Sequence, residues 1–118
     1  MSDIWAKVDA IIKGKHIPIE IVLELTRHCN LRCCHCYNVK DNRELGFSQI
    51  KEITRQLRKA GCLFLILTGG EVFTKSDFLE IAAFIRSAGL DIRIFTNGTL
   101  ITPGIAKELK KIAVREVG

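Results

Sequence analysis

The sequence predicts an α/β fold in which parallel strands alternate with helical crossovers. Apolar stretches of strand length alternate with segments whose apolar residues recur at helical spacing. The run LFLIL at 63–67 is continuously apolar, as in strands covered on both faces. Polar motifs follow each of three predicted strands, and parallel strands bring such motifs to one edge of their sheet.

The first predicted element is an amphipathic helix over residues 2–13, within an N-terminal segment 1–14. Ser2 or Asp3 is placed to cap this helix, and Gly14 stands where a helix-ending glycine belongs. Its apolar stripe consists of Ile4, Val8, Ile11 and Ile12. We expect Trp5 to join the helix to the core of the domain.

The remaining residues, 19–118, are predicted to form the domain itself. Strands are expected at 19–25, 63–67 and 91–95, where β-branched residues and leucines gather. Residues 114–117 have the composition of the start of a fourth strand. Because helical segments separate the strands, we expect a parallel sheet with right-handed βαβ crossovers.

Three crossover helices are predicted between these strands. The first is capped by Ser48 and closed by Gly61. The second covers 77–88, with Thr74 and Asp77 at the spacing of a capping box and Phe78, Ile81, Ala82 and Ile85 on one face. The third begins at Thr102, with a proline at its first helical position and Ile105, Leu109 and Ile112 inward.

Composition excludes several classes of protein. The chain has 118 residues, enough for one small domain. Its net charge of +5 comes from scattered Lys and Arg, which indicates a solvated surface and no nucleic-acid partner. No window approaches about 18 apolar residues, so we expect no membrane span. Five cysteines and no secretory signal favour a cytoplasmic protein over a disulfide framework.

Three polar motifs are expected to meet at one edge of the sheet. The cysteine-rich stretch CNLRCCHC follows the first strand, Gly69-Gly70-Glu71 follows the second and Thr96-Asn97-Gly98 follows the third. The carboxyl ends of parallel strands share an edge, where ligands of such sheets bind. The coincidence of three motifs predicts a single site.

The spacing of the cysteines indicates a metal site, with two kinds open. Cys29, Cys33 and Cys36 form a C-x3-C-x2-C pattern, whereas the side chain of Cys34 diverges from its neighbour and is not expected to be a ligand. A structural zinc would take a fourth ligand, with His28 or His35 as the candidates. An iron–sulfur cluster held by only three cysteines would keep one iron open, as a catalytic site requires.

From about Ile19 onward the sequence resembles the radical S-adenosylmethionine (radical SAM) superfamily. The motifs that carry the resemblance are ELTRHCNLRCCHCYN, LTGGEVF and FTNGTLI. Among the branches of this superfamily, the sequence looks most like the one that matures peptides and cofactors, whose members often carry a C-terminal cysteine-rich domain called SPASM. The resemblance implies a partial TIM-like barrel, with about three βα units of a six-unit barrel in this chain. One departure is Val72, where many relatives have proline.

The resemblance also implies roles for individual residues. Cys29, Cys33 and Cys36 would hold three irons of a [4Fe–4S] cluster, and the fourth iron would chelate S-adenosylmethionine (SAM). His35 would lie near the adenine, while Gly69 and Gly70 would let the backbone approach the methionyl part. Glu71 or its neighbours would meet the SAM ammonium, and Thr96 and Asn97 would line the same pocket.

The implied reaction is reductive cleavage of SAM to a 5′-deoxyadenosyl radical that modifies a substrate. A flavodoxin- or ferredoxin-like electron donor and a peptide or small-molecule substrate are the implied partners. Two other readings stay open: a non-catalytic zinc or iron–sulfur module, and a truncated product without independent function. An unclosed barrel leaves open strand edges, through which we expect oligomers to be possible.

Overall fold

The strands form one parallel sheet. The computed structural model describes residues 2–31 and 43–118. In this part of the chain the strands are β1 (Glu20–Thr26), β2 (Phe64–Gly69), β3 (Asp91–Ile94) and β4 (Glu116–Val117). They lie in the order β1-β2-β3-β4, and each neighbouring pair is parallel. The prediction of a parallel sheet with a short fourth strand is confirmed.

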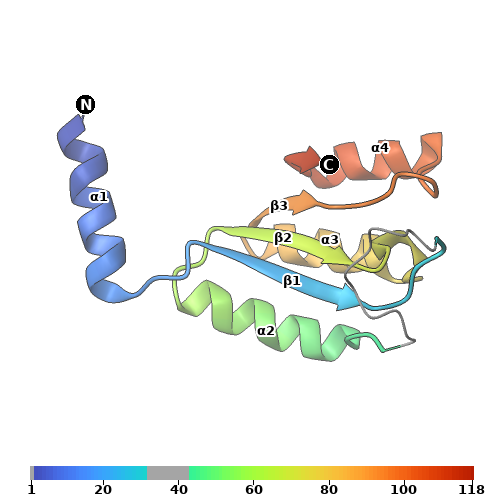
Figure 1. Cartoon of the computed structure of the whole chain (residues 1–118), viewed down its shortest axis with the longest axis horizontal. Coiled ribbons are helices and arrows are strands. Elements are labelled where there is room, and N and C mark those ends of the chain that lie inside the picture. Colours follow the sequence, from blue (N-terminus) through green and yellow to red (C-terminus); the bar gives the residue numbers. More distant parts are fainter. Residues whose placement is uncertain (1, 32–42) are drawn as a thin grey trace.

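The connecting helices cover one side of this sheet. They are α2 (Phe47–Lys59), α3 (Phe78–Ser87) and α4 (Pro103–Ile112). The middle helix, α3, contacts both α2 and α4. Figure 1 shows them following one another around the sheet. Strands in sequence order with helices on one side form a curved layer like part of a barrel, whereas doubly wound sheets carry helices on both sides. The expected partial TIM-like barrel, with three βα units, is confirmed.

The core lies between the sheet and these helices. Alternate residues of the strands point into it, and Leu25, Leu67 and Ile94 are completely buried there. The helix α3 contributes the face predicted from its spacing: Phe78, Ile81, Ala82 and Ile85. Burying each large side chain contributes about 1.5–3 kcal/mol, so this contact is the main force that holds α3 on the sheet.

The opposite face of the sheet carries no helix among the described residues and bears charge. Val22, Ile66, Arg93 and Glu116 stand side by side in register across the strands. The Arg93 guanidinium donates to Oε2 of Glu116 at 2.7 and 2.9 Å and lies 3.6 Å from Glu20. In a barrel this face points inward.

The N-terminal helix differs from its prediction in extent and in contacts. The helix α1 covers Ser2–Lys15, so Gly14 lies inside it. The chain leaves the helix at His16, whose φ of 51° is left-handed, and Ile17 N–H then bonds back to the carbonyl of Ile12. The expectation that Trp5 contacts the core is wrong, because this residue is 72% exposed. Figure 1 shows α1 standing away from the sheet.

Two predicted helix starts are also corrected. Gly46 precedes α2, and its N–H donates to the Gln49 side chain at 2.8 Å, so Ser48 lies inside the helix and does not cap it. Thr74 belongs to the short 3₁₀ helix η1 (Val72–Thr74), and the side chain of Asp77 caps no N–H of α3. The predicted cap of α4 is confirmed, because Thr102 Oγ1 accepts from Ile105 N–H at 3.2 Å.

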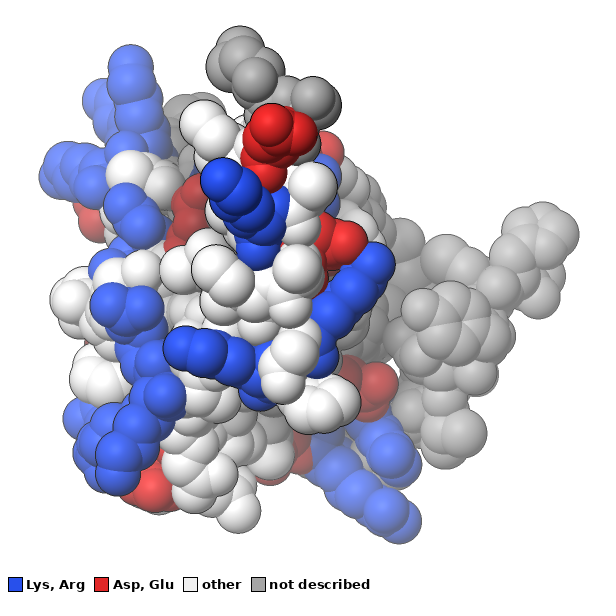
Figure 2. Space-filling model, turned by 90° about the vertical axis from the view of Figure 1, so that its left-hand side faces the viewer, with Lys and Arg blue, Asp and Glu red and all other residues white. Residues whose placement is uncertain are grey.

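The surface agrees with the scattered charge of the sequence. Figure 2 shows Lys and Arg spread over the face that it views, with Asp and Glu among them. Within residues 2–31 and 43–118, no helix combines the length and the apolar character that crossing a bilayer requires.

Candidate functional site

The loops that leave β1, β2 and β3 meet at the carboxyl edge of the sheet. Gly70 N–H donates to the carbonyl of Thr26 at 2.9 Å, and Glu71 N–H donates to the carbonyl of His28 at 2.8 Å. These bonds join the second loop to the first. Asn97 N–H donates to Oε1 of Glu71 at 2.8 Å, which joins the third loop to the second. The site is therefore built from segments far apart in the sequence.

Two glycines, Gly69 at the end of β2 and Gly70 in the loop after it, allow the end of β1 and the loop that follows it to approach closely. A Cβ at Gly70 would lie 2.4 Å from the carbonyl oxygen of His28, and one at Gly69 would lie 2.5 Å from that of Thr26. Both distances are far inside van der Waals contact. The close packing of the chain at the ends of β1 and β2 thus requires both glycines, independently of any ligand.

Glu71 is completely buried and joins the second loop to the third. The hydroxyl of Thr96 donates to both carboxylate oxygens, at 2.7 and 2.8 Å. The backbone N–H of Phe73 donates to Oε2 at 2.9 Å, and that of Asn97 to Oε1. A carboxylate accepts several hydrogen bonds without donating, so every donor around it is matched.

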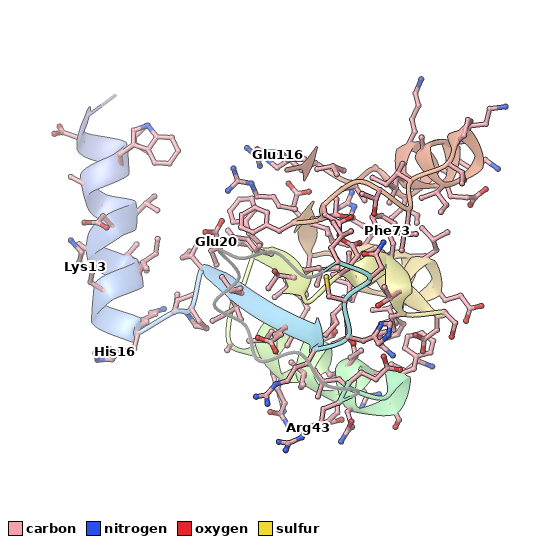
Figure 3. All side chains as sticks on the ribbon, turned by 45° about the vertical axis from the view of Figure 1, so that its right-hand side comes forward. Lys13, His16, Glu20, Arg43, Phe73 and Glu116 are labelled. Carbon is pink, nitrogen blue, oxygen red and sulfur yellow. The ribbon has the colours of Figure 1, made fainter. Side chains whose placement is uncertain are left out.

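The cysteine-bearing segment is closed at its base. Arg27 N–H donates to the carbonyl of Arg43 at 2.8 Å, and Leu45 N–H donates to the carbonyl of Leu25 at 2.9 Å. Thr26 and Glu44 form an antiparallel bridge between these bonds, and the Thr26 hydroxyl donates to the Glu44 carboxylate at 3.2 Å. Figure 3 shows Arg43 near the end of β1. The chain therefore leaves and re-enters the sheet edge at one place.

The buried ammonium group of Lys75, which follows the second loop, lies beside the paired ends of the cysteine-bearing segment. Only 3% of the Lys75 side chain is exposed. Its Nζ lies 2.9 Å from Oδ1 of Asp77, in an ion pair without hydrogen-bond geometry, and 3.7 Å from Glu44. Lys75 thus connects the returning end of the cysteine segment to the start of α3.

Cys29 lies in a tight turn just beyond β1. Leu31 N–H donates to its Sγ at 3.5 Å. The side chain of Asn30, between them, reaches across to the third loop, where it bonds with Asn97 and Thr99. The turn that carries Cys29 is therefore tied through Asn30 to the loop that follows β3.

The structure brings six of the predicted site residues to this edge, namely Cys29, Gly69, Gly70, Glu71, Thr96 and Asn97. The other predicted residues, Cys33, His35 and Cys36, lie outside the described residues, as does Cys34. Within the described part, no three Cys, His, Asp or Glu side chains gather in a way that would hold a metal ion.

Sequence reasoning missed Asn30, Thr99 and Lys75. Asn30 directly follows a candidate ligand, so its position was the available signal. Lys75 had no such signal, because one of the two carboxylates that it contacts, that of Glu44, lies far away in the sequence. Thr99 follows the Asn-Gly pair and resembled an ordinary turn residue.

Comparisons with known proteins agree with this geometry. The family model for the radical SAM superfamily matches residues 23–118. Fe-coproporphyrin III synthase of Methanosarcina barkeri is 36% identical over 102 residues, which are 83% of this chain and 26% of that protein. Mycofactocin maturase MftC of Mycolicibacterium smegmatis is 34% identical over 105 residues, which are 86% of this chain and 27% of that protein.

A solved structure shares the fold. Streptococcus suis SuiB bound to the precursor peptide SuiA superposes with a TM-score of 0.74 at 24% identity, over 92% of this chain and 25% of that one. The chain thus spans about a quarter of the length of each of these proteins.

Proposed function

Because the chain belongs to the radical SAM superfamily, we propose that its carboxyl sheet edge binds a [4Fe–4S] cluster and SAM. The proposed cluster ligands are Cys29, Cys33 and Cys36. The observation that supports this assignment is the convergence at one edge of the Cys29 turn, the Gly-Gly-Glu loop and the Thr-Asn-Gly loop. Three thiolates suit iron–sulfur ligation with one iron left for a further ligand.

We assign the SAM-facing positions to Gly69, Gly70, Thr96 and Asn97, with His35 beside the adenine. Glu71 belongs to the same set, but both of its carboxylate oxygens already accept hydrogen bonds from the chain. Its contribution to SAM therefore comes through the loop that it holds in place. When bound, the cluster and SAM supply reductive cleavage of SAM to a 5′-deoxyadenosyl radical, and the protein positions the reactants.

The substrate class that we propose is a peptide or a cofactor precursor. One relative is named as a synthase of Fe-coproporphyrin III and another as a mycofactocin maturase. A tetrapyrrole and a precursor peptide, the latter as in the complex of SuiB with SuiA, are the two forms to test. We further propose an electron donor of the flavodoxin or ferredoxin type and a reducing, cytoplasmic location, where thiols stay available for iron.

Anaerobic reconstitution of the chain with iron and sulfide tests the cluster. The proposal expects about four irons and four sulfides per chain. Cys33→Ala should abolish this cluster, whereas Cys34→Ala, the matched control in the same stretch, should retain it. SAM should then change the electron paramagnetic resonance (EPR) spectrum of the reduced cluster.

Metal analysis separates this function from the zinc alternative. One zinc per chain without acid-labile sulfide would contradict the proposal and favour a zinc module with three cysteines and a histidine. An intact cluster in Cys33→Ala would contradict the ligand assignment.

A further inference from the structure

Three side chains from two loops form a closed ring of hydrogen bonds beside Cys29. Asn30 Nδ2 donates to Thr99 Oγ1 at 2.9 Å. Thr99 Oγ1 donates to Asn97 Oδ1 at 2.7 Å, and Asn97 Nδ2 donates to Asn30 Oδ1 at 3.0 Å. Thr99 N–H adds a fourth bond to Asn97 Oδ1, at 3.0 Å. Each side chain in the ring both donates and accepts.

The ring has one consistent direction, from Asn30 to Thr99 to Asn97 and back. Hydrogen bonds arranged head to tail polarise one another, so losing one member weakens the others. The direction also fixes which end of each amide faces its neighbour. A hydroxyl at position 99 is needed because only a group that both accepts and donates closes the ring.

The ring connects two parts of the proposed site. Asn30 is the central residue of the turn in which Leu31 N–H bonds to Cys29 Sγ. Asn97 is held at its backbone by the buried carboxylate of Glu71. The side chain of Asn30 therefore joins the turn that presents the sulfur of Cys29 to a loop that is itself held from the core.

We propose that Asn30 is a positioning residue, which through Thr99 and Asn97 holds the Cys29 sulfur in place for ligation. This role rests on the proposed function, because it concerns the first of the three cluster ligands. The three ring residues are exposed. Their bonds therefore contribute little to overall stability, so the effect of the ring is on the placement of the turn.

The test compares variants at both ends of the ring in the reconstituted chain. Asn30→Ala removes the member next to Cys29, and Thr99→Val removes the hydroxyl from the far side while keeping the shape of the side chain. Thr99→Ser keeps the hydroxyl and is the matched control. The readouts are the rate of iron release to a chelator, the EPR spectrum of the reduced cluster, and hydrogen exchange of the Thr99 amide in the apoprotein.

A loss of the ring should speed iron release about two- to tenfold, the range that corresponds to one net hydrogen bond. Asn30→Ala and Thr99→Val should shift the EPR spectrum alike, and the double variant should release iron no faster than Asn30→Ala, since both break the same ring. Thr99→Ser should match the wild type. The melting temperature of each apoprotein should fall by no more than a few degrees, and Thr99 amide exchange should accelerate in Asn30→Ala.

Three results would overturn the role of Asn30. If Asn30→Ala and Thr99→Val both release iron at the wild-type rate and give the wild-type EPR spectrum, the role of Asn30 is refuted while the proposed function stands. Additive effects of the two substitutions would show that they act separately. A wild-type chain that assembles no cluster would overturn the proposed function and this role together.

Discussion

The hydroxyl of Thr96 donates to both carboxylate oxygens of Glu71, at 2.7 and 2.8 Å, although the two residues follow different strands. The carboxylate is completely buried. A buried polar group is tolerated when its partners are present, and its cost appears when one partner is removed. The pair therefore makes the second and third loops one unit.

Glu71→Gln should destabilise the apoprotein by about 1–3 kcal/mol, because the new amide group must face a donor where an oxygen accepted. Urea unfolding followed by circular dichroism measures the loss. Thr96→Ser keeps the hydroxyl and should cost much less than Thr96→Val. A double-mutant cycle in which Glu71→Gln and Thr96→Val add independently would contradict the pairing.

Gly70→Ala should destabilise the chain by about 1–3 kcal/mol or more, because its Cβ would lie 2.4 Å from the backbone oxygen of His28. Gly104→Ala is the control, since its Cβ would lie 3.7 Å from the nearest atom, Oγ1 of Thr102. In the first turn of α4 this change should be neutral or stabilising by up to about 1 kcal/mol. Chemical denaturation of both variants gives the comparison, and equal losses would refute the close-approach argument.

Lys75→Met should lower the free energy of unfolding by about 1–2 kcal/mol, because Asp77 and Glu44 lose the cation that they contact. Both carboxylates are partly exposed, and solvation limits the loss. Lys111→Met removes a cation from an exposed pair with Glu108 and should change stability by less than about 0.5 kcal/mol. The two unfolding curves are measured at low and high salt. A small effect at Lys75 would mean that the buried ion pair contributes nothing to the base of the cysteine segment.

The pH dependence of stability should show the effect of the raised pKa of the Cys62 thiol. Burial raises the pKa of the Cys62 thiol, a hydrogen bond with the backbone of Phe64 lowers it, and the charge of Glu20 raises it further. A raised pKa in the folded state favours the protonated thiol there. Its contribution to stability is therefore complete below the pKa of the unfolded thiol, about 8.5, and is lost as the pH rises through the folded value.

Cys62→Ala should accordingly lose less stability between pH 8 and pH 10 than the wild type does. Urea unfolding under reducing conditions at several pH values measures the difference. Parallel pH profiles for the two proteins would show that Cys62 does not titrate differently in the folded state.

The order of strands and helices could be predicted from the sequence, because it depends on local periodicity. The buried face of α3 and the cap at Thr102 follow from spacing within a few residues, and both are confirmed. The exposure of Trp5 could not be predicted, because an apolar stripe indicates that a helix needs a partner without showing which one.

For the site, too, features set by nearby residues could be predicted, whereas contacts between distant segments could not. That three loops share an edge follows from strand direction alone. The burial of Glu71 depends on Thr96 and Phe73 closing around it, and the requirement for glycine at position 70 depends on the path of the chain at His28. Such contacts arise only when segments far apart in sequence are packed, so a motif indicates their place and not their partners.

The paired ends of the cysteine segment have a consequence for metal affinity. Arg27 and Arg43 are joined by a backbone hydrogen bond, so the ends of the 15-residue stretch between them are tied together as soon as the sheet forms. Closing a loop of this length costs on the order of 2–3 kcal/mol in chain entropy. This entropy is lost when the sheet folds, and not when a metal binds. Tying the two ends should raise the effective concentration of the thiols within the stretch, so we expect the first bond to a metal to favour the next.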